Sequence, residues 1–498
     1  MKKLIVIIFI VFGAFLTFSL YRTFAYDTSV VEETPSTTDL EYTFKIGNSS
    51  IKQITVDSGE TKYYDVVLGN PNPAKISYGV YYEMVSPSTK PDGFSIEYTS
   101  KSTGESTGKV DKEGNITLNL VVTNTSSSSV IVKLGTVAGY VNGGDLELSG
   151  NQEFIPKKKF PKATELVESL NDNSTGDSGS GVYKVQHSAI PANSSATGEI
   201  IEATDDYRYY GANPNNYICL DNSTGTCEDR HLYRIIGSIY EELENANRIK
   251  VIKATPLTDG TTEGFSWDYT SSDSYSNIWA TVTSGNYSNS LSSGSTLMQL
   301  LNSGLWWKGT SGSYYNGSTT ATTVNFTNYK LSDKAKSYIS MSKYYLGGYN
   351  GTTPLTNNMY GYERGILKYN TNRPLYWDGM IGLMYPSDYG YAAGNSCVTE
   401  TNLYNYDGGC NKKDWLWMTN SSDYSNRSEW LMIPNSEVST RITAIRYDGS
   451  FGDFDDYDVS DLSVYRVYSV RPSFYLASNT LITSGDGSLN NPYLVTLE

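Results

Sequence analysis

Apolar and polar residues alternate in several short segments of the first third of the chain. Residues 76–82 and 116–122 alternate with period two, so each segment is expected to form a strand with one buried face. Shorter strand-like runs lie around Phe44, Ile54 and Ile96 and at residues 63–68 and 130–134, with Gly, Pro, Asn and Ser between them. Roughly seven short strands in about 110 residues are typical of an immunoglobulin-like β-sandwich, which we assign to residues 41–155.

The last third of the chain carries the largest apolar residues. An apolar run at residues 380–385 stops at Pro386, and the polar residues 387–391 that follow are expected to turn the chain at the end of a buried strand. Trp415, Trp417 and Trp430 lie in strand-like segments beside Leu and Met, so each is at least as readily a core residue as a ligand contact. Residues 470–476 add further large apolar side chains, so we expect this part of the chain to form one compact core.

The middle of the chain predicts a β-hairpin and a few helices. Residues 233–239 and 248–253 are expected to pair across a short acidic turn. Ser295 is a candidate N-cap for a helix over 296–302, and Ser332 for one over 333–339. We therefore expect residues 182–498 to form one α+β domain.

Two polar segments read as connectors. Residues 27–40 are rich in Thr, Ser and Glu and are expected to be a spacer. Residues 156–181 begin with a Pro- and Lys-rich stretch, allow a short helix over 162–170, and end in a Gly-, Ser- and Asn-rich stretch. The second segment is expected to be a linker between the two folded regions.

The N-terminal residues 1–26 resemble a targeting segment. Lys2 and Lys3 precede an uncharged, mostly apolar run over residues 4–20, slightly shorter than the roughly 20 residues that span a bilayer. The lysines favour a cytoplasmic N-terminus, so the rest of the chain is expected outside the cell membrane, held there by a single transmembrane helix. A signal peptide cleaved after Ala25, which would release the protein, is the alternative.

Charge excludes one class of partner. The chain has 38 Lys and Arg against 53 Asp and Glu, a net charge of -15, so it lacks the basic surface that nucleic acid requires. Tyrosine is abundant, with 43 residues against 14 Phe. Because a tyrosine can bury its ring and keep its hydroxyl in water, this excess suits half-buried strand positions and ligand-binding faces.

The four cysteines fit an oxidising compartment. The loop between Cys219 and Cys227 and the loop between Cys397 and Cys410 are both short and polar, so two local disulfides are the simplest pairing, although four cysteines allow three. A zinc site at Cys219, Cys227 and His231 is the weaker alternative, since it lacks an obvious fourth ligand.

Several motifs in the second region carry a resemblance. The segments YRYYGANPNNY at 207–217, GLMYPSDYGY at 382–391 and VRP at 470–472 together resemble an uncharacterised family of exported surface domains of Gram-positive gut bacteria (Bacillota). That family is distantly similar to C-type-lectin-like and formylglycine-generating-enzyme-like folds. The resemblance implies a lectin-like fold with a core strand at Arg471, and it implies no activity. Formylglycine-generating enzymes need a late pair of reactive cysteines, and no cysteine follows Cys410.

The loop before this last strand combines acidic and aromatic residues. Carboxylates this dense repel one another unless they are solvated, paired or bound to a cation, so calcium is possible, although the spacing does not fit an EF-hand. Mixed carboxylates and rings would also suit a sugar or a basic protein. The candidate ligand-binding residues are Tyr447, Asp448, Asp453, Asp455, Asp456, Tyr457 and Asp458, and the calcium candidates are Asp453, Asp455, Asp456 and Asp458. We expect no other cofactor.

An enzyme is the less favoured class. The motifs GxSxG and HExxH are absent. A glycosidase needs two carboxylates, which Asp388, Glu429 or Asp453 would have to supply. The sequence therefore predicts a membrane-anchored, adhesin-like surface protein that binds an extracellular glycan or protein. A cell-envelope carbohydrate-active hydrolase and a structural surface protein without a ligand are the alternatives.

Overall fold

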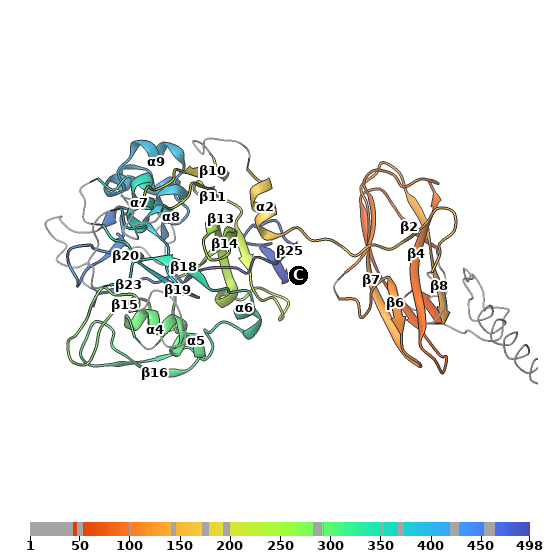
Figure 1. Ribbon diagram of the computed structural model, residues 1–498, viewed down its shortest axis with the longest axis horizontal. Helices are drawn as coiled ribbons and strands as arrows, with labels where there is room; N and C mark the ends of the chain where they lie inside the picture. The colour runs from red at the N-terminus through yellow and green to blue at the C-terminus, as the bar shows by residue number, and fades with distance from the viewer. Residues whose placement is uncertain are drawn as a thin grey trace, which may run out of the picture. The chain divides into compact units, whose positions relative to one another are not determined.

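The chain is mainly β and forms two compact units, Met1–Lys159 and Phe160–Glu498 (Figure 1). The computed structural model describes residues 43–46, 53–99, 101–140, 146–171, 179–192, 200–281, 291, 293–349, 353–366, 373–418, 428–452 and 464–498. The predicted anchor at 1–26 and spacer at 27–40 lie outside these residues. Among the helices that the structure describes, none has the length and apolar character to cross a membrane.

The first unit is a sandwich of two antiparallel sheets. One sheet has the strand order β1-β3-β7-β5, and the other has the order β2-β8-β4-β6, with β9 also paired to β4. The strands are β1 (Thr43–Ile46), β2 (Gln53–Val56), β3 (Glu60–Gly69), β4 (Ile76–Ser86), β5 (Phe94–Tyr98), β6 (Thr107–Val110), β7 (Asn115–Asn124), β8 (Val130–Tyr140) and β9 (Gln152–Phe154).

The strands predicted from alternation in this unit are confirmed. In β7, Ile116, Leu118 and Leu120 are buried and the residues between them are less so, which is the expected period of two. The sequence did not indicate β6 and β9, because both are too short to show a period.

A mixed sheet forms the centre of the second unit. Its path runs β10-β11-β13-β12-β26-β25, with β14 paired to both β13 and β24. All pairs are antiparallel except β12 with β26. The strands are β10 (Gly181–His187), β11 (Thr204–Tyr210), β12 (Tyr217–Cys219), β13 (Leu232–Glu241), β14 (Ala246–Lys253), β24 (Ser473–Tyr475), β25 (Thr480–Ser484) and β26 (Tyr493–Leu497). The predicted hairpin is confirmed as β13 and β14.

Smaller sheets and short helices surround this sheet. The smaller sheets pair β15 (Phe265–Ser266) with β23 (Val467–Tyr468), β16 (Ser311–Tyr314) with β17 (Thr322–Asn325), β18 (Ser342–Tyr345) with β19 (Tyr376–Gly379), and β20 (Glu429–Pro434) with β21 (Ile442–Ile445) and β22 (Phe451–Gly452). The helices are α2 (Ala163–Ser169), α4 (Thr296–Asn302), α5 (Leu305–Lys308), α6 (Asp333–Ser337), α7 (Thr356–Glu363), α8 (Pro386–Ala392) and α9 (Asn395–Glu400), with 3-10 turns η1 (Asp229–His231), η2 (Leu403–Gly408) and η3 (Asn411–Lys413). Figure 1 shows α7, α8 and α9 grouped together beside β10 and β11.

Two predictions about helices of the second unit need correction, and one is confirmed. The short helix expected within the linker is α2, and its Ala163 and Val167 are buried in the core of this unit, so it belongs to the unit and not to a connector. Helix α4 has its predicted bounds, with the Ser295 hydroxyl accepting a hydrogen bond from the Met298 N–H. Helix α6 is shorter than predicted and ends at Ser337.

The predicted turn after Pro386 is wrong, because Pro386 begins helix α8. Proline is favoured in a first helical turn, where its missing N–H would have no partner in the helix. The Asp388 carboxylate accepts a hydrogen bond of 2.9 Å from the Tyr385 N–H and so caps the helix. Gly390 lets α8 approach α7, since a Cβ there would lie 2.1 Å from the Thr356 hydroxyl oxygen. Asp388 is therefore a buried helical residue and not part of an exposed turn.

The tryptophans lie in the core. Trp430 is fully buried and Trp415 nearly so, while Trp417 is half-buried and packs against the same cluster. The indole N–H of Trp430 donates to the Phe265 carbonyl at 2.8 Å, and the indole N–H of Trp415 donates to the Tyr209 carbonyl at 3.0 Å. These tryptophans therefore connect segments that are far apart in the sequence.

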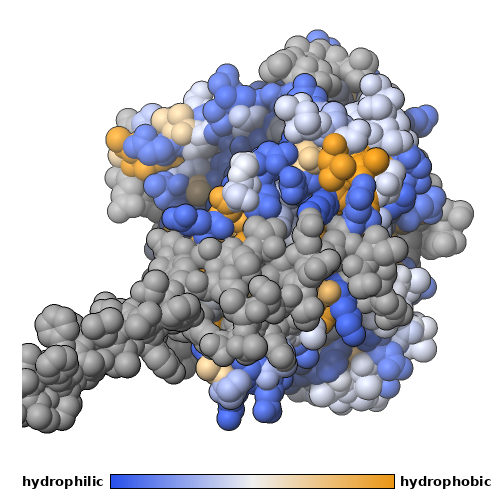
Figure 2. Space-filling view, turned by 90° about the vertical axis from the view of Figure 1, so that its right-hand side faces the viewer, coloured by the Kyte–Doolittle hydropathy of each residue, from blue (hydrophilic) through white to orange (hydrophobic). Residues whose placement is uncertain are grey.

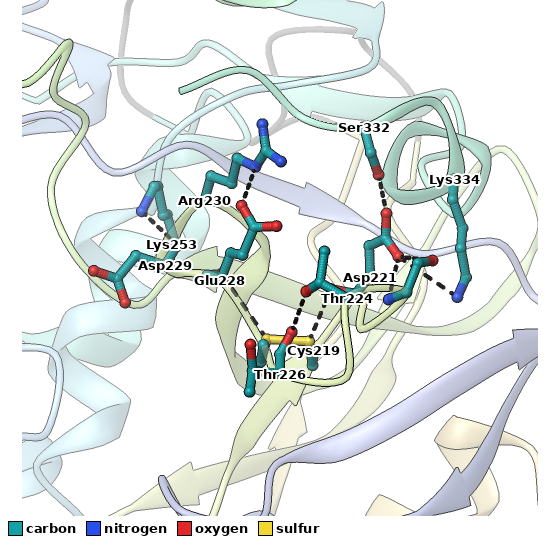
Figure 3. Close-up of a disulfide and its surroundings, with 12 residues drawn as sticks. Cys219, Asp221, Thr224, Thr226, Glu228, Asp229, Arg230, Lys253, Ser332 and Lys334 are labelled. Atoms are coloured by element: carbon teal, nitrogen blue, oxygen red, sulfur yellow. Dashed lines mark hydrogen bonds and ion pairs between the residues drawn. A yellow bond between two sulfur atoms is a disulfide. The ribbon is translucent and has the colours of Figure 1, made fainter. Parts of the chain in front are cut away.

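Both predicted disulfides are present, Cys219–Cys227 and Cys397–Cys410. The zinc alternative is therefore wrong, and the His231 Nε2 instead lies 3.1 Å from the Ser332 N–H. The first disulfide closes a loop that is fixed to α6 by Asp221, whose carboxylate accepts a 2.6 Å hydrogen bond from the Ser332 hydroxyl (Figure 3). Lys334 lies 3.6 Å from the same carboxylate.

Candidate functional site

A pocket of about 250 Å³ opens in the second unit where β13, β18, β19 and α7 come together. Four tyrosines from these elements are its common feature, and we call it the tyrosine pocket. Its lining residues are Ile200, Ile201, Glu202, Thr204, Tyr240, Glu242, Lys343, Tyr345, Tyr360 and Tyr376.

Glu242 is the polar centre of the tyrosine pocket. One of its carboxylate oxygens accepts a short hydrogen bond from the Tyr345 hydroxyl, and the other accepts one of 2.9 Å from the Lys343 ammonium. Burial acts to lower the pKa of Lys343, but the Glu242 carboxylate outweighs it and holds this pKa above its ordinary value. Both charged side chains remain about a quarter exposed, so a ligand can reach them.

The ring of Tyr360 is covered on both faces. His187 stacks on it with ring centroids 3.6 Å apart, and the Arg364 guanidinium lies 3.5 Å from its centroid. Two groups this close cannot share one face, so Tyr360 turns its edge and hydroxyl to the pocket, where the hydroxyl lies 3.2 Å from the Thr204 hydroxyl. This wall of the pocket therefore offers hydrogen-bonding groups and not an open ring face.

The part of the pocket lined by Tyr240 and Tyr376 is more open. The Lys343 ammonium lies 4.8 Å from the centroid of Tyr376 and so covers one face of that ring. Tyr240 and Tyr376 are both half-exposed, which leaves part of each ring accessible. Glu202 at the rim is exposed and adds a second carboxylate. The pocket therefore combines hydroxyls, carboxylates, one ammonium group and accessible aromatic surface.

A fully buried set of charges lies behind Tyr360. Asp206 and Arg208 on β11, Lys250 on β14 and Asp388 on α8 form what we call the buried charge cluster. Arg208 lies 2.7 Å from Asp206 and 2.9 Å from Asp388, and Lys250 lies 2.6 Å from Asp388. His187 joins the cluster through a contact of 2.8 Å with Asp206, and each of these side chains is at most 4% exposed.

Burial and pairing oppose each other in this cluster. Burial would raise the pKa of Asp388, but Lys250 and Arg208 outweigh it and hold the pKa below its ordinary value. Burial lowers the pKa of Lys250 and of His187. Nearby, burial raises the pKa of Glu363 to about 7, although Arg364 and two hydrogen bonds from Ser387 act against it.

The predicted acidic ligand site is only partly visible. Tyr447 is 51% exposed, and the Asp448 carboxylate accepts hydrogen bonds from the N–H and the hydroxyl of Ser450, as in a polar turn. Asp453, Asp455, Asp456, Tyr457 and Asp458 lie outside the described residues, so the loop and its calcium hypothesis stay predictions. In the part of the chain that the structure describes, no cluster of His, Cys, Asp and Glu is arranged to hold a metal ion.

Two of the three carboxylates considered for a glycosidase are not accessible. Asp388 belongs to the buried charge cluster, and Glu429 is 4% exposed and forms contacts of 2.6 and 2.8 Å with Arg471. Neither can reach a sugar without breaking its buried ion pair. The third candidate, Asp453, lies outside the described residues. Asp388 and Glu429 are therefore structural residues here.

Sequence reasoning missed the tyrosine pocket and the buried charge cluster. Their residues come from segments more than one hundred positions apart, such as Glu242 and Lys343. Each residue alone is unremarkable in a chain with so many tyrosines and carboxylates. The one usable signal was the excess of tyrosine, which pointed to ligand-binding faces without locating them.

No protein-family model, curated protein or solved structure matches the chain.

Proposed function

We propose that the chain is an exported bacterial surface protein whose second unit binds an extracellular carbohydrate in the tyrosine pocket. The observation that carries the proposal is the pocket itself, in which tyrosine rings and hydroxyls surround the Glu242–Lys343 pair. Sugars are bound by side chains of this kind, since carboxylates and hydroxyls pair with sugar hydroxyls and rings pack against the C–H face.

The size of the pocket favours a small polar ligand over a protein. A volume of about 250 Å³ is near the lower limit for small-molecule sites, which fits one or two sugar rings. On the face in Figure 2, the hydrophobic residues among those coloured form small separate groups within a hydrophilic surface. Apolar groups of this size are normal on a protein surface, and the coloured part of this face carries no argument for a protein partner.

We further propose where the protein acts and what the other parts of the chain do. Two disulfides favour an oxidising compartment outside the cytoplasm. We propose that the run at residues 4–20 anchors the protein in the membrane, that the first unit is an immunoglobulin-like stalk, and that the second has a lectin-like fold. The resemblance to exported Gram-positive surface domains supports this layout.

A glycan array probed with the purified full chain tests the proposal. We expect saturable binding that is weakened at least about tenfold, or roughly 1.4 kcal/mol, by Tyr240→Ala and by Glu242→Gln. Tyr63→Ala is the matched control, because Tyr63 is 76% exposed on the first unit and should not contribute. The thermal unfolding midpoints of all variants should also be measured, so that unfolding of a variant is not mistaken for a specific loss of ligand binding.

A further variant separates the two candidate sites. Changing Asp453, Asp455 and Asp456 together to Asn should leave binding unchanged, with and without calcium, if the tyrosine pocket is the site. Loss of binding in this variant alone would place the ligand at the acidic loop. An array with no binding to the wild-type protein would refute the carbohydrate proposal and favour a structural role.

A further inference from the structure

The second unit holds an amine and a carboxyl group in direct contact inside its core. The Lys250 Nζ lies 2.6 Å from Oδ2 of Asp388, and both side chains are 1% exposed. The rings of Tyr385 and Tyr475 flank the ammonium, with centroids 4.3 and 5.5 Å away. Water therefore has little access to this contact.

We propose that Lys250 and Asp388 become joined by an intramolecular amide bond. The proton that makes Lys250 an ammonium passes to Asp388, which gives a neutral amine beside a neutral carboxylic acid. The amine nitrogen then attacks Cγ of Asp388. The Nζ–Cγ bond forms, the Cγ–Oδ2 bond breaks, and Oδ2 leaves with two protons as one molecule of water.

Low polarity acts in favour of the first step, whereas Lys250 and Arg208 oppose it by holding the pKa of Asp388 below its ordinary value. A buried ion pair bears the desolvation cost of two charges, whereas a neutral pair or an amide does not. Burial lowers the pKa of Lys250, which favours the unprotonated, nucleophilic amine.

Arg208 is placed to stabilise the intermediate. Its Nη1 donates to Oδ1 of Asp388 at 2.9 Å, and Oδ1 is the oxygen that stays in the amide. Negative charge would develop on Oδ1 when the amine attacks, so a cation held at this position acts as a preformed oxyanion site. The leaving oxygen Oδ2 accepts a hydrogen bond of 2.9 Å from the Tyr385 N–H, which fixes the carboxyl plane.

Glu363 is a second buried carboxyl group close to the segment that carries Asp388. It is fully buried and accepts hydrogen bonds of 2.9 and 2.7 Å from the N–H and hydroxyl of Ser387, the residue next to Asp388. Burial and the charge of the nearby Asp388 carboxylate both raise its pKa, which reaches about 7.

The charges that remain after condensation are balanced. The reaction removes one positive and one negative charge from the buried charge cluster. Asp206 stays paired with Arg208 at 2.7 Å, and Glu363 stays beside Arg364 at 3.6 Å.

Among the ion pairs that the structure describes in this unit, the others do not combine a buried amine with a buried carboxyl group. Glu241 and Glu429 are buried but pair with guanidinium groups, which do not lose a proton in proteins. Lys343 pairs with Glu242 in the tyrosine pocket, where both are about a quarter exposed. Lys253 is buried but donates to the Asp229 carbonyl and the Thr255 hydroxyl.

Mass spectrometry of the wild-type chain tests the proposal directly. After reduction of the disulfides and proteolysis, we expect a branched peptide that joins the segment around Lys250 to the segment around Asp388. Its mass should be lower by one water than the sum of the two linear peptides. This readout does not depend on how the ends of the chain are processed.

Three variants sharpen the test. Lys250→Arg keeps the charge but should abolish the branched peptide, and Lys253→Arg should keep it. In Asp388→Asn the same bond would form with loss of ammonia, so its branched peptide should have the same mass as that of the wild type. Two linear peptides of full mass from folded wild-type protein, incubated for days at neutral pH, would overturn the proposal.

Discussion

At the scale of single residues, the balance between burial and hydrogen bonding decides how each carboxyl group behaves. Asp268 accepts hydrogen bonds of 2.7 Å from the Ser276 N–H and 3.0 Å from the Thr296 N–H. Burial outweighs these bonds and raises its pKa to about 6. Asp259 shows the reverse, because backbone hydrogen bonds from Thr262, Asn325 and Thr261 outweigh burial and lower its pKa. Two carboxylates in one unit should therefore respond to pH in opposite senses.

Replacing Asp268 by Asn should reveal this effect. Protonated Asp268 favours folding, so its contribution is complete below the ordinary pKa of 3.8 and is lost as pH rises through about 6. Chemical denaturation from pH 4 to 7 should show the unfolding free energy of the wild type falling relative to Asp268→Asn, by up to about 3 kcal/mol. Asp259→Asn is the control. The contribution of Asp259 is complete above its ordinary pKa of 3.8 and is lost only as pH falls below that value, so this variant should stay nearly parallel to the wild type from pH 4 to 7. Parallel curves for all three proteins would contradict this account.

Local chemistry could be predicted at this scale, whereas distant partners could not. The pairing of Cys219 with Cys227 followed from a short polar loop. The stacking of His187 on Tyr360 depends on the path of the chain between them, so no local pattern in the sequence indicates it. A buried ion pair such as Lys250 with Asp388 leaves no local pattern, because neither residue needs a special neighbour in sequence.

At the scale of the element, a helix cap shows how one side chain can have two roles. The Ser332 hydroxyl accepts from the Ala335 N–H at 3.1 Å and so caps α6, and it also donates to Asp221 in the disulfide loop. The Ser295 hydroxyl caps α4 in the same way, by accepting from the Met298 N–H at 3.1 Å. The two serines thus form a natural pair for comparison.

Changing each serine to Ala should separate the two roles. Loss of either cap should cost about 1 kcal/mol of unfolding free energy. Ser332→Ala should cost about 1 kcal/mol more, because the largely buried Asp221 loses a hydrogen-bond donor. Urea denaturation measures both values. Equal losses in the two variants would show that the bond to Asp221 adds nothing.

Periodicity and caps predicted the elements that are locally determined. Strands β4 and β7 and helix α4 appear where alternation or a serine cap placed them. Helix α8 was missed because Pro386 ends a strand or begins a helix equally well, and the choice depends on packing against α7. Strands of two or three residues, such as β23 and β24, exist only through their partners.

At the scale of the whole molecule, each unit has a hydrophobic core of its own. One core lies between the two sheets of the first unit, and the other surrounds the mixed sheet of the second. Both disulfides belong to the second unit, where they close short loops with sequence separations of 8 and 13. Stability of the two units should therefore be separable by redox conditions.

Calorimetry with and without a reductant should show this separation. We expect two unfolding transitions, of which only one shifts down when the disulfides are reduced. Each loop contributes about 3 kcal/mol in the chain-entropy account. A first-unit variant such as Val80→Ala should lower only the other transition, since Val80 is fully buried in that core. A single transition that responds to both changes would mean that the units unfold together.

The position of the last strands has a consequence for biosynthesis. Strand β26 lies between β12 and β25, and β14 finds one of its partners in β24. Strands made early in synthesis thus keep open edges until residues beyond 473 have been translated. Under the export proposed above, the second unit could close its sheet only after its final segment had crossed the membrane. Folding of this unit is therefore tied to the synthesis of its final segment, since its central sheet is incomplete without β24 and β26.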